Sequence, residues 1–484
     1  MIKSMVAAMI AFVAGATNPG EMEQSDNEIR WMVVSDPHVL APTLIKSEGE
    51  ASEALARDEM KLPLESEAIL NALVDTVLRE RPTTLLIAGD LTFNGELASH
   101  QLLVSTLDRL RAAGVNTLVI PGNHDISNPY AHYFDGDSTS SAPTVNRTEF
   151  AALYRDYGYA DPALRDPNSL SYIAYPAPGI ALLAIDSNRD EENTLVARGD
   201  KNNSYHSAGR VKEETLDWIR EQAAIAKSEG RSIVAMMHHH LLEHFDGEAR
   251  VLRNYIVDDY RTLMTTLIDC DVRAVFTGHL HITDAVRDFN ADGDSIFDVA
   301  TGSLTTYPFP LRTITVNNGL MHVDTRFLAS SGEPWVEQGR AQVENGVPIL
   351  AGTIARKAWS RLDKLKAMAG SLLGDVSLPD NVPAAVNILL RHLRQPLGES
   401  LLLVTRGGED PQQAAAIMQS IRDGVSAMIG DIMPKQANFV TPFVMENLMP
   451  RVEPYMRSAL EDRNHVDTDS ESSTNDHCLD IPLR

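Results

Sequence analysis

The sequence is short of cysteines and of basic residues, and each shortage excludes a class of protein. Its 484 residues include only two cysteines, Cys270 and Cys478, which cannot build a disulfide framework. Lysine and arginine number 42 against 67 aspartates and glutamates, so the net charge is −25. Because binding to duplex nucleic acid needs clustered positive charge, this balance argues against such a partner and favours a role in solubility.

The sequence also lacks an apolar run long enough to span a bilayer as a helix, so no membrane span is expected. The N-terminal apolar run, Ser4 to Ala14, follows Lys3 and leads into the small residues Ala14-Gly15-Ala16. This is the layout of a secretory signal peptide. We expect residues 1–16 to be a signal peptide and residues 17–30 a leader, in a periplasmic or secreted protein. The alternative is a cytoplasmic protein whose N-terminal segment is not a targeting signal.

The remaining chain divides by its hydrophobic patterns, and its length suggests two or three domains of about 100–200 residues each. Over residues 31–332, short apolar runs alternate with amphipathic helical patterns, which predicts an α/β domain. Residues 333–465 predict a helical domain with helices at Ile349 to Ala369, Val382 to Leu393, Pro411 to Met433 and Val444 to Leu460. The polar composition of residues 466–484 predicts a disordered tail.

Several short polar motifs follow the apolar, strand-like runs of the first domain. In chain order they are Asp36-x-His38, Gly89-Asp90, Gly122-Asn123-His124-Asp125, His238-His239 and Gly278-His279-x-His281. Ligand sites of α/β sheets lie at the carboxyl ends of strands, so we expect these motifs to converge. Each motif alone is weak, but the whole ordered set is a strong signal.

The residue types of the motifs predict a site for two divalent cations. Imidazole suits Zn and Fe, whereas carboxylate and amide oxygens suit harder ions such as Mn. A carboxylate has two oxygens, so Asp90 can bridge two ions about 3.5–4 Å apart. With only two acidic ligands, the site stays positive, attracts a phosphate anion and activates a water. Gly89, Gly122 and Gly278 are expected where a Cβ would clash as the chain leaves each strand.

These motifs resemble those of the calcineurin-like metallophosphoesterases: D-x-H, GD, GNH(D/E), H and GH-x-H. The resemblance covers roughly Trp31 to Asp324. The two-domain bacterial cyclic-nucleotide phosphodiesterases are a closer resemblance, carried by Gly89 to Glu96, Pro121 to Pro129, Tyr154 to Gly158 and His238 to His244. The resemblance implies a four-layer αββα sandwich with a helical C-terminal domain.

The function that the resemblance implies is hydrolysis of a small-molecule phosphodiester, a 3′,5′-cyclic nucleotide in the first place, by a metal-bridging hydroxide. A phosphomonoesterase or a broad-specificity phosphodiesterase acting on small organic phosphates is the first alternative. A metal-bound scaffold for protein contacts is the second. The sequence leaves open the oligomeric state and which of Fe, Mn or Zn is bound.

The resemblance also assigns roles to residues. Asp36, His38 and His281 would hold one metal ion, Asn123, His238 and His279 the other, and Asp90 would bridge them. His124 would lie over the phosphate and either donate to one of its oxygens or protonate the leaving alkoxide, with Asp125 orienting its ring. Asn94 would contact the phosphate or support its loop. The family often has His-His-Pro at positions 238–240, so His239 or His240 is an alternative to His238.

Overall fold

The computed structural model describes residues 29–194, 205–328, 333–372, 379–408, 411–461 and 476–483. The predicted signal peptide and the leader up to residue 28 lie outside the described residues. Residues 29 and 30, assigned to the leader, instead begin the first strand, β1.

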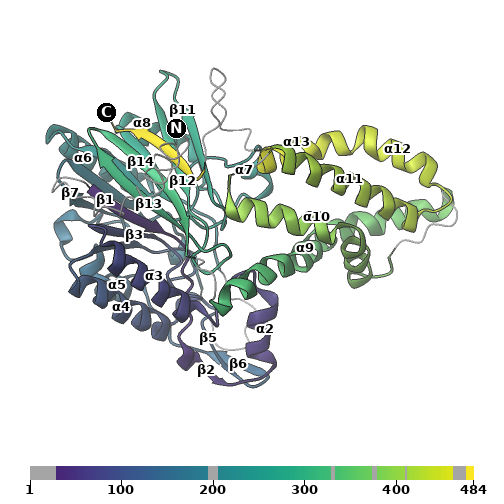
Figure 1. Cartoon of the computed structure of the whole chain (residues 1–484), viewed down its shortest axis with the longest axis horizontal. Helices are drawn as coiled ribbons and strands as arrows, with labels where there is room; N and C mark the ends of the chain where they lie inside the picture. Colours follow the sequence, from purple (N-terminus) through teal and green to yellow (C-terminus); the bar gives the residue numbers. More distant parts are fainter. Residues whose placement is uncertain are drawn as a thin grey trace, which may run out of the picture.

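The first domain is built on two six-stranded sheets (Figure 1). The first sheet has parallel β1, β3 and β4, extended by antiparallel strands on the β1 side. In spatial order its strands are β15 (Cys478–Pro482), β14 (Leu320–Phe327), β13 (Pro310–Asn317), β1 (Ile29–Val34), β3 (Thr84–Ala88) and β4 (Asn116–Ile120).

The second sheet is parallel at its centre and closed by an antiparallel strand at each edge. In spatial order its strands are β11 (Asp284–Phe289), β12 (Ser295–Ala300), β10 (Val272–Thr277), β9 (Ser232–Met237), β8 (Ile180–Ile185) and β7 (Tyr172–Ala177). A small third sheet, β2 (Ile45–Ser47), β5 (His132–Asp135) and β6 (Ser138–Ser141), lies beside the short helix α2 (Glu50–Asp58).

The two large sheets pack face to face, as strand alternation shows. Leu182 and Ala184 of β8 belong to the core shared with the first sheet, whereas Leu183 and Ile185 pack with the outer helices. The helices outside the second sheet are α6 (Glu213–Ser228) and α8 (Tyr260–Asp269), and those packed on the first are α3 (Ser66–Glu80) and α4 (Leu97–Ala112). This arrangement confirms the predicted αββα sandwich.

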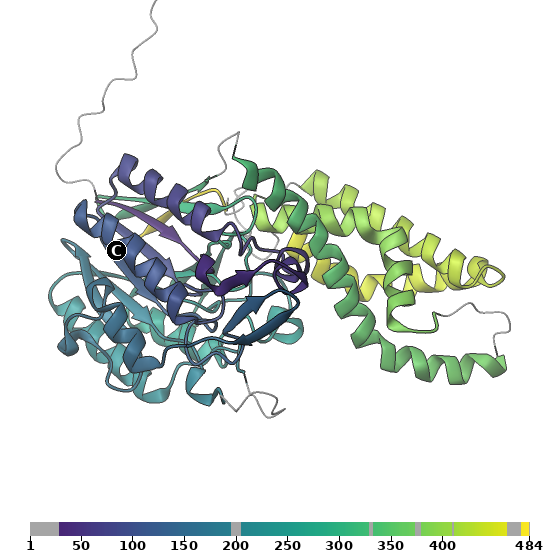
Figure 2. The same ribbon diagram turned by 90° about the horizontal axis from the view of Figure 1, so that it is seen from below.

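The C-terminal helices form a second body that extends away from the sandwich in both views (Figures 1 and 2). They are α9 (Pro334–Leu372), α10 (Val382–Arg406), α11 (Pro411–Ile432), α12 (Ala437–Asn447) and α13 (Met449–Glu461), and α10, α11 and α13 supply most of a separate apolar core. The helix predicted to end at Leu393 continues through Pro396 to Arg406, and the last predicted helix is broken at Leu448. Within the described residues, no helix combines the length and apolar character that crossing a membrane requires.

The prediction of a disordered tail at residues 466–484 is wrong for its final segment. Cys478–Pro482 forms β15, which pairs antiparallel with β14 at the edge of the first sheet. Leu479, Ile481 and Leu483 are buried, while the side chains between them point outward. The polar residues upstream dominate the composition of the tail and conceal this short apolar alternation.

The buried end of the chain leads to a stability prediction. Ile481 is fully buried, so Ile481→Ala leaves a cavity and is expected to lower the free energy of unfolding by about 2–5 kcal/mol. Urea unfolding followed by circular dichroism measures the change. Ile225→Ala, at a side chain that is 42% exposed, is the matched control. Equal effects of the two substitutions would contradict the packing of β15.

Candidate metal centre

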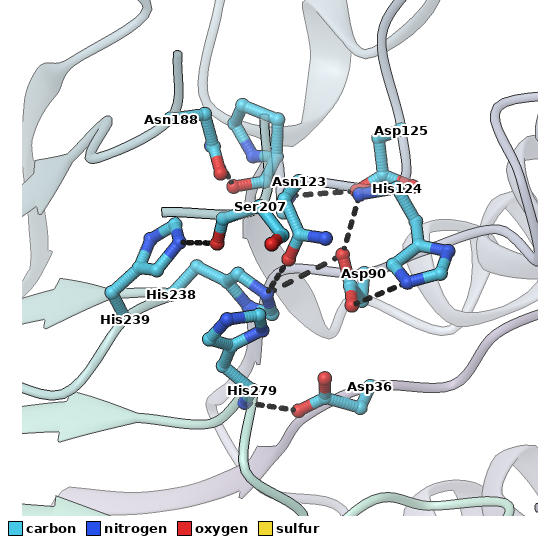
Figure 3. A network of polar contacts seen from close by, with 12 residues as sticks. Asp36, Asp90, Asn123, His124, Asp125, Asn188, Ser207, His238, His239 and His279 are labelled. Carbon is cyan, nitrogen blue, oxygen red and sulfur yellow. Dashed lines mark hydrogen bonds and ion pairs between the residues drawn. The ribbon is translucent and has the colours of Figure 1, made fainter. Parts of the chain in front are cut away.

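The predicted motifs meet where the carboxyl ends of strands from both large sheets face one another (Figure 3). Asp36 and His38 follow β1, Asp90 follows β3, and Asn123 follows β4. From the second sheet, His238 follows β9, and His279 and His281 follow β10. Three groups of possible metal ligands form here: Asp36, His38 and His281; His38, Asp90 and His124; and Asp90, His238 and His279. The predicted convergence is therefore observed.

The first cluster consists of Asp36, His38 and His281. The Nε2 atoms of the two histidines are 3.1 Å apart, and Asp36 Oδ1 lies 3.8 Å from that of His38 and 3.4 Å from that of His281. Asp36 Oδ1 is buried and has no hydrogen-bond partner among the described residues. Its other oxygen, Oδ2, accepts from Ser35 Oγ and from the His279 amide. The remaining atoms, Asp36 Oδ1 and the two Nε2 atoms, face one another in an arrangement that fits a divalent cation.

The second cluster consists of Asn123, His238 and His279, next to Asp90. His238 Nε2 is 3.0 Å from Asn123 Oδ1 and 3.4 Å from Asp90 Oδ1. His238 Nδ1 lies 2.9 Å from the Ala88 carbonyl, and His279 Nε2 lies 3.0 Å from the Asn254 carbonyl. A carbonyl only accepts, so these two nitrogens carry the hydrogens. His238 Nε2 and His279 Nδ1 are then the ring nitrogens left for a metal, which each could bind once it carries no proton.

Asp90 lies between the two clusters, with one oxygen toward each. Its Oδ1 is 3.4 Å from His238 Nε2, and its Oδ2 is 3.6 Å from His38 Nε2. Burial alone would raise the pKa of Asp90, but the neighbouring His238 and His124 hold this pKa well below its usual value. In turn, burial disfavours a charged His238, yet the Asp90 carboxylate outweighs it and raises the pKa of His238 to about 9. The position of Asp90 fits the predicted bridging role.

The backbone at the site is held in an unusual conformation. Asp36, His38, Asp90, His279 and His281 all have positive φ angles, between +41° and +70°. Non-glycine residues seldom adopt this left-handed region, and such residues cluster where a surrounding structure fixes a functional geometry. The tight turns after the strands therefore direct the side chains into the site at a conformational cost.

Two of the predicted glycines are explained by direct contact with ligand residues. A Cβ on Gly89, whose φ is +88°, would lie 2.5 Å from Nδ1 of His238. A Cβ on Gly122 would lie 2.1 Å from the backbone nitrogen of Asp90. Both distances are shorter than any non-bonded contact, so a larger residue would displace the ligands.

Comparisons with known proteins agree with this site. The sequence profile of the family described as calcineurin-like phosphoesterase matches residues 29–283, which is more than half of the chain. The chain belongs to this family. The dinuclear enzymes of the family use two divalent cations, and the two clusters fit such a pair.

Individual relatives of this phosphoesterase are distant. A protein of Rhodococcus erythropolis described as a probable cyclic nucleotide phosphodiesterase is 23% identical over 203 residues, which cover 42% of this chain and 52% of that protein. The chain thus spans about half the length of this curated relative. Among solved structures, a dimetal phosphatase from Danio rerio is 16% identical, with a TM-score of 0.42 over 62% of this chain and 97% of that one. A purple acid phosphatase from yellow lupin is 13% identical, with a TM-score of 0.35 over 63% and 52%.

In this phosphoesterase, His124 lies at the edge of the clusters, with its side chain 25% exposed. Its Nε2 is 3.9 Å from Asp90 Oδ2, while its Nδ1 lies 2.7 Å from the Phe93 carbonyl and 3.0 Å from Asn94 Oδ1. Nδ1 therefore carries a hydrogen, and Nε2 is the ring atom free to exchange a proton with a substrate. Asn94, predicted to contact the phosphate or to support its loop, lies beside the ring of His124.

The predicted contact between Asp125 and the ring of His124 is wrong. The Asp125 carboxylate accepts from the amides of Leu91, Thr92 and Gly122 and from the Thr92 hydroxyl, at 2.7 to 3.0 Å. It thereby joins the loop after β3 to the loop after β4. The reason is geometric: the turn at Gly122 points Asp125 back toward the strand ends, and the Phe93 carbonyl and Asn94 take the place beside the ring.

Hydrogen bonding distinguishes the three histidines at positions 238–240, each of which was a candidate ligand. His239 Nδ1 lies 2.8 Å from Ser187 Oγ, and its Nε2 lies 3.0 Å from the Ser207 carbonyl, so both ring nitrogens are engaged. His240 Nδ1 lies 2.8 Å from Glu248 Oε1, away from the clusters. Only His238 directs a free nitrogen at Asp90, which favours it over His239 and His240 as the ligand.

Three residues near the site were not predicted from the sequence. Tyr205 accepts a short hydrogen bond from Asn123 Nδ2, which turns Asn123 Oδ1 toward His238. Asn188 donates to the Pro121 carbonyl over 2.7 Å and so holds the loop after β4. Lys61 is 7% exposed, and its positive charge adds to burial in lowering the pKa of His38 and His124. A lysine inside the apolar stretch around Leu62 was the available signal for Lys61.

The contacts of Asp125 allow a test of whether this residue stabilises the two ligand loops or orients the ring of His124. In Asp125→Asn, an NH₂ group replaces one carboxylate oxygen. This NH₂ group then faces the N–H donors from which the oxygen had accepted hydrogen bonds. We expect a loss of roughly 1–3 kcal/mol in the free energy of unfolding and weaker metal binding, because both ligand loops lose their brace. Unfolding and metal analysis of the purified variant measure the two effects. Full stability and metal content with a loss of turnover alone would instead support the orienting role.

Proposed function

We propose that this phosphoesterase hydrolyses phosphodiesters, with 3′,5′-cyclic nucleotides as the first candidate. The observation that carries the proposal is the position of Asp90, whose two oxygens face two separate clusters of metal-binding atoms beside His124. When bound, two divalent ions would supply the charge that activates a water and neutralises the phosphoryl oxygens. Asp36, His38 and His281 would hold one ion, and Asn123, His238 and His279 the other.

The residues of the chain then have distinct tasks. Asp90 shares one negative charge between the two clusters, so the pair of sites stays net positive and attracts a phosphate anion. Lys61, buried nearby, adds a further positive charge. His124 exchanges a proton at Nε2 with the leaving oxygen, while the Phe93 carbonyl and Asn94 fix its ring.

The preference for a cyclic nucleotide rests on two supports. The first is the resemblance of the motif regions, such as Gly89 to Glu96, to the bacterial cyclic-nucleotide phosphodiesterases. The second is the description of the Rhodococcus erythropolis relative, which matches at 23% identity. A phosphomonoesterase and a metal-bound scaffold are the alternatives that an assay must separate.

The test is a panel of substrates run side by side after reconstitution with Mn²⁺, Fe²⁺ or Zn²⁺. It compares 3′,5′-cyclic AMP, bis(p-nitrophenyl) phosphate and p-nitrophenyl phosphate. Higher kcat/KM for the two diesters is the expected result. A preference for the monoester would replace the proposal with a phosphomonoesterase, and absence of turnover with every metal would favour the scaffold.

For His124 we expect a loss of catalysis without a loss of metal. His124→Ala should lower kcat for diesters by about 10²-fold or more, because it removes the group that moves the proton. Metal content measured by plasma mass spectrometry should stay at the wild-type value. His322→Ala, at a side chain 43% exposed on β14, is the control. Metal loss from His124→Ala would show that His124 is a ligand.

For Asp90 we expect a loss of metal together with a loss of turnover. Asp90→Asn removes the carboxylate shared by the clusters, so both metal sites should weaken together and turnover should fall with them. Metal titration followed by calorimetry checks the number of sites. Two tightly bound ions in this variant would overturn the bridging role.

A further inference from the structure

A cavity of about 450 Å³ lies between the sandwich and the helical domain. Its volume falls within the range of small-molecule pockets, about 300–1,000 Å³. Most of its lining is apolar, with Met60 from the sandwich and Ile349, Leu350, Leu401 and Val404 from α9 and α10. The few polar side chains on its wall include His244 and Asp284, which are joined to each other over 2.8 Å. The cavity is therefore suited to a hydrocarbon group.

The cavity adjoins the metal centre. His279 and His281, one from each metal cluster, form part of its wall together with Leu280 and Ile282. Met60 lies on the wall beside Lys61, whose ammonium group influences His38 and His124. A molecule with an anionic phosphate at the clusters can therefore extend an apolar group into the cavity.

The helical domain is fixed against the sandwich at this cavity. Thr283 donates through its amide to the Val404 carbonyl, over 3.2 Å, and through its hydroxyl to the Thr405 carbonyl, over 2.8 Å. On the other side, the amide of Asp246 donates to Ser458 Oγ over 2.7 Å. These contacts hold α10 and α13 as walls, so the cavity is a built feature of the interface.

We propose that this cavity binds an apolar ester group of the substrate, so that the hydrolysed molecule is an amphiphile, an anionic phosphodiester carrying a hydrocarbon group. This inference rests on the proposed function, because it takes the phosphate to bind at the metal clusters. Within the proposed phosphodiesters, it favours a linear diester with a hydrocarbon group over a 3′,5′-cyclic nucleotide, through a second region of contact that the helical domain supplies. Burial of each methylene contributes about 0.8 kcal/mol, so affinity should rise roughly three- to fourfold per methylene until the cavity is filled.

Alkylphosphonates test the cavity, because they carry an anionic phosphorus group and an alkyl chain but have no ester to hydrolyse. Methyl-, butyl- and octylphosphonate are compared as competitive inhibitors of methyl p-nitrophenyl phosphate hydrolysis. The inhibition constant of the wild-type protein should fall at least 10-fold from methyl to butyl and further for octyl. Equal inhibition constants along the series would overturn the inference while leaving the proposed function intact.

A variant that fills the cavity tests whether the dependence on chain length arises there. Ala459 of α13 lines the cavity, so Ala459→Trp should abolish the dependence of inhibition on chain length. Ala415→Trp makes the same change at an exposed position of α11 and should keep the dependence. If Ala459→Trp does not fold, Leu401→Gln places a polar group in the wall and should weaken the dependence. Retention of the full dependence in the folded cavity variants would contradict the proposal.

If the wild-type protein hydrolyses no diester with any metal, the proposed function fails but the cavity can still be judged. Calorimetric titration of octylphosphonate and methylphosphonate into the wild-type and Ala459→Trp proteins then gives the answer. Tighter octylphosphonate binding that is lost in the variant supports the cavity, and equal binding overturns it.

Discussion

The site depends on holding oxygen and nitrogen atoms that can bind a metal close together in the protein interior. Asp36 Oδ1 has no partner among the described residues, and the facing Nε2 atoms of His38 and His281 are 3.1 Å apart. An unsatisfied buried polar group such as Asp36 Oδ1 costs roughly 1–3 kcal/mol, and a bound cation would offset this cost. The surrounding structure must be rigid enough to keep the metal-binding atoms in place, and much of the local architecture serves this purpose.

Rigidity comes from joining the two sheets at the site itself. His238, on the second sheet, donates across the interface to the Ala88 carbonyl of the first. In the same sense, the His279 amide, which follows β10 of the second sheet, donates to Asp36 Oδ2, which follows β1 of the first. Close packing of Gly89 against His238 leaves no room for movement between them. The ligands thus double as the contacts that fix the distance between the two sheets, and this explains why their turns tolerate left-handed backbone angles.

The convergence of the candidate ligands could be predicted because each has a clear local signal, a polar residue just after an apolar strand. Asp36, Asp90, Asn123, His238 and His279 could be placed in this way, since parallel strands bring their carboxyl ends to one edge. The neighbours of His124 could not be predicted in the same way. Whether Asp125 or Asn94 lies beside its ring depends on the direction in which the turn at Gly122 leaves the strand, and a pattern of residue types does not encode this direction. Strand β15 was missed because its alternation is only a few residues long and follows a polar segment.

The two domains contribute different parts of substrate recognition. The chemistry of the clusters is common to phosphoryl transfer and carries no preference among esters, because the metal-binding atoms recognise only the phosphate. Selection among substrates has to come from contacts beyond it. The described wall that meets this requirement is the apolar one that Leu401 and Val404 of α10 bring up to His279 and His281. Since Thr283, which anchors this wall, lies two residues after His281, the helical domain is tied directly to the metal-binding loop. A shift of α10 would therefore alter the shape of the cavity and the position of a ligand together, which makes substrate selection and metal geometry properties of one interface.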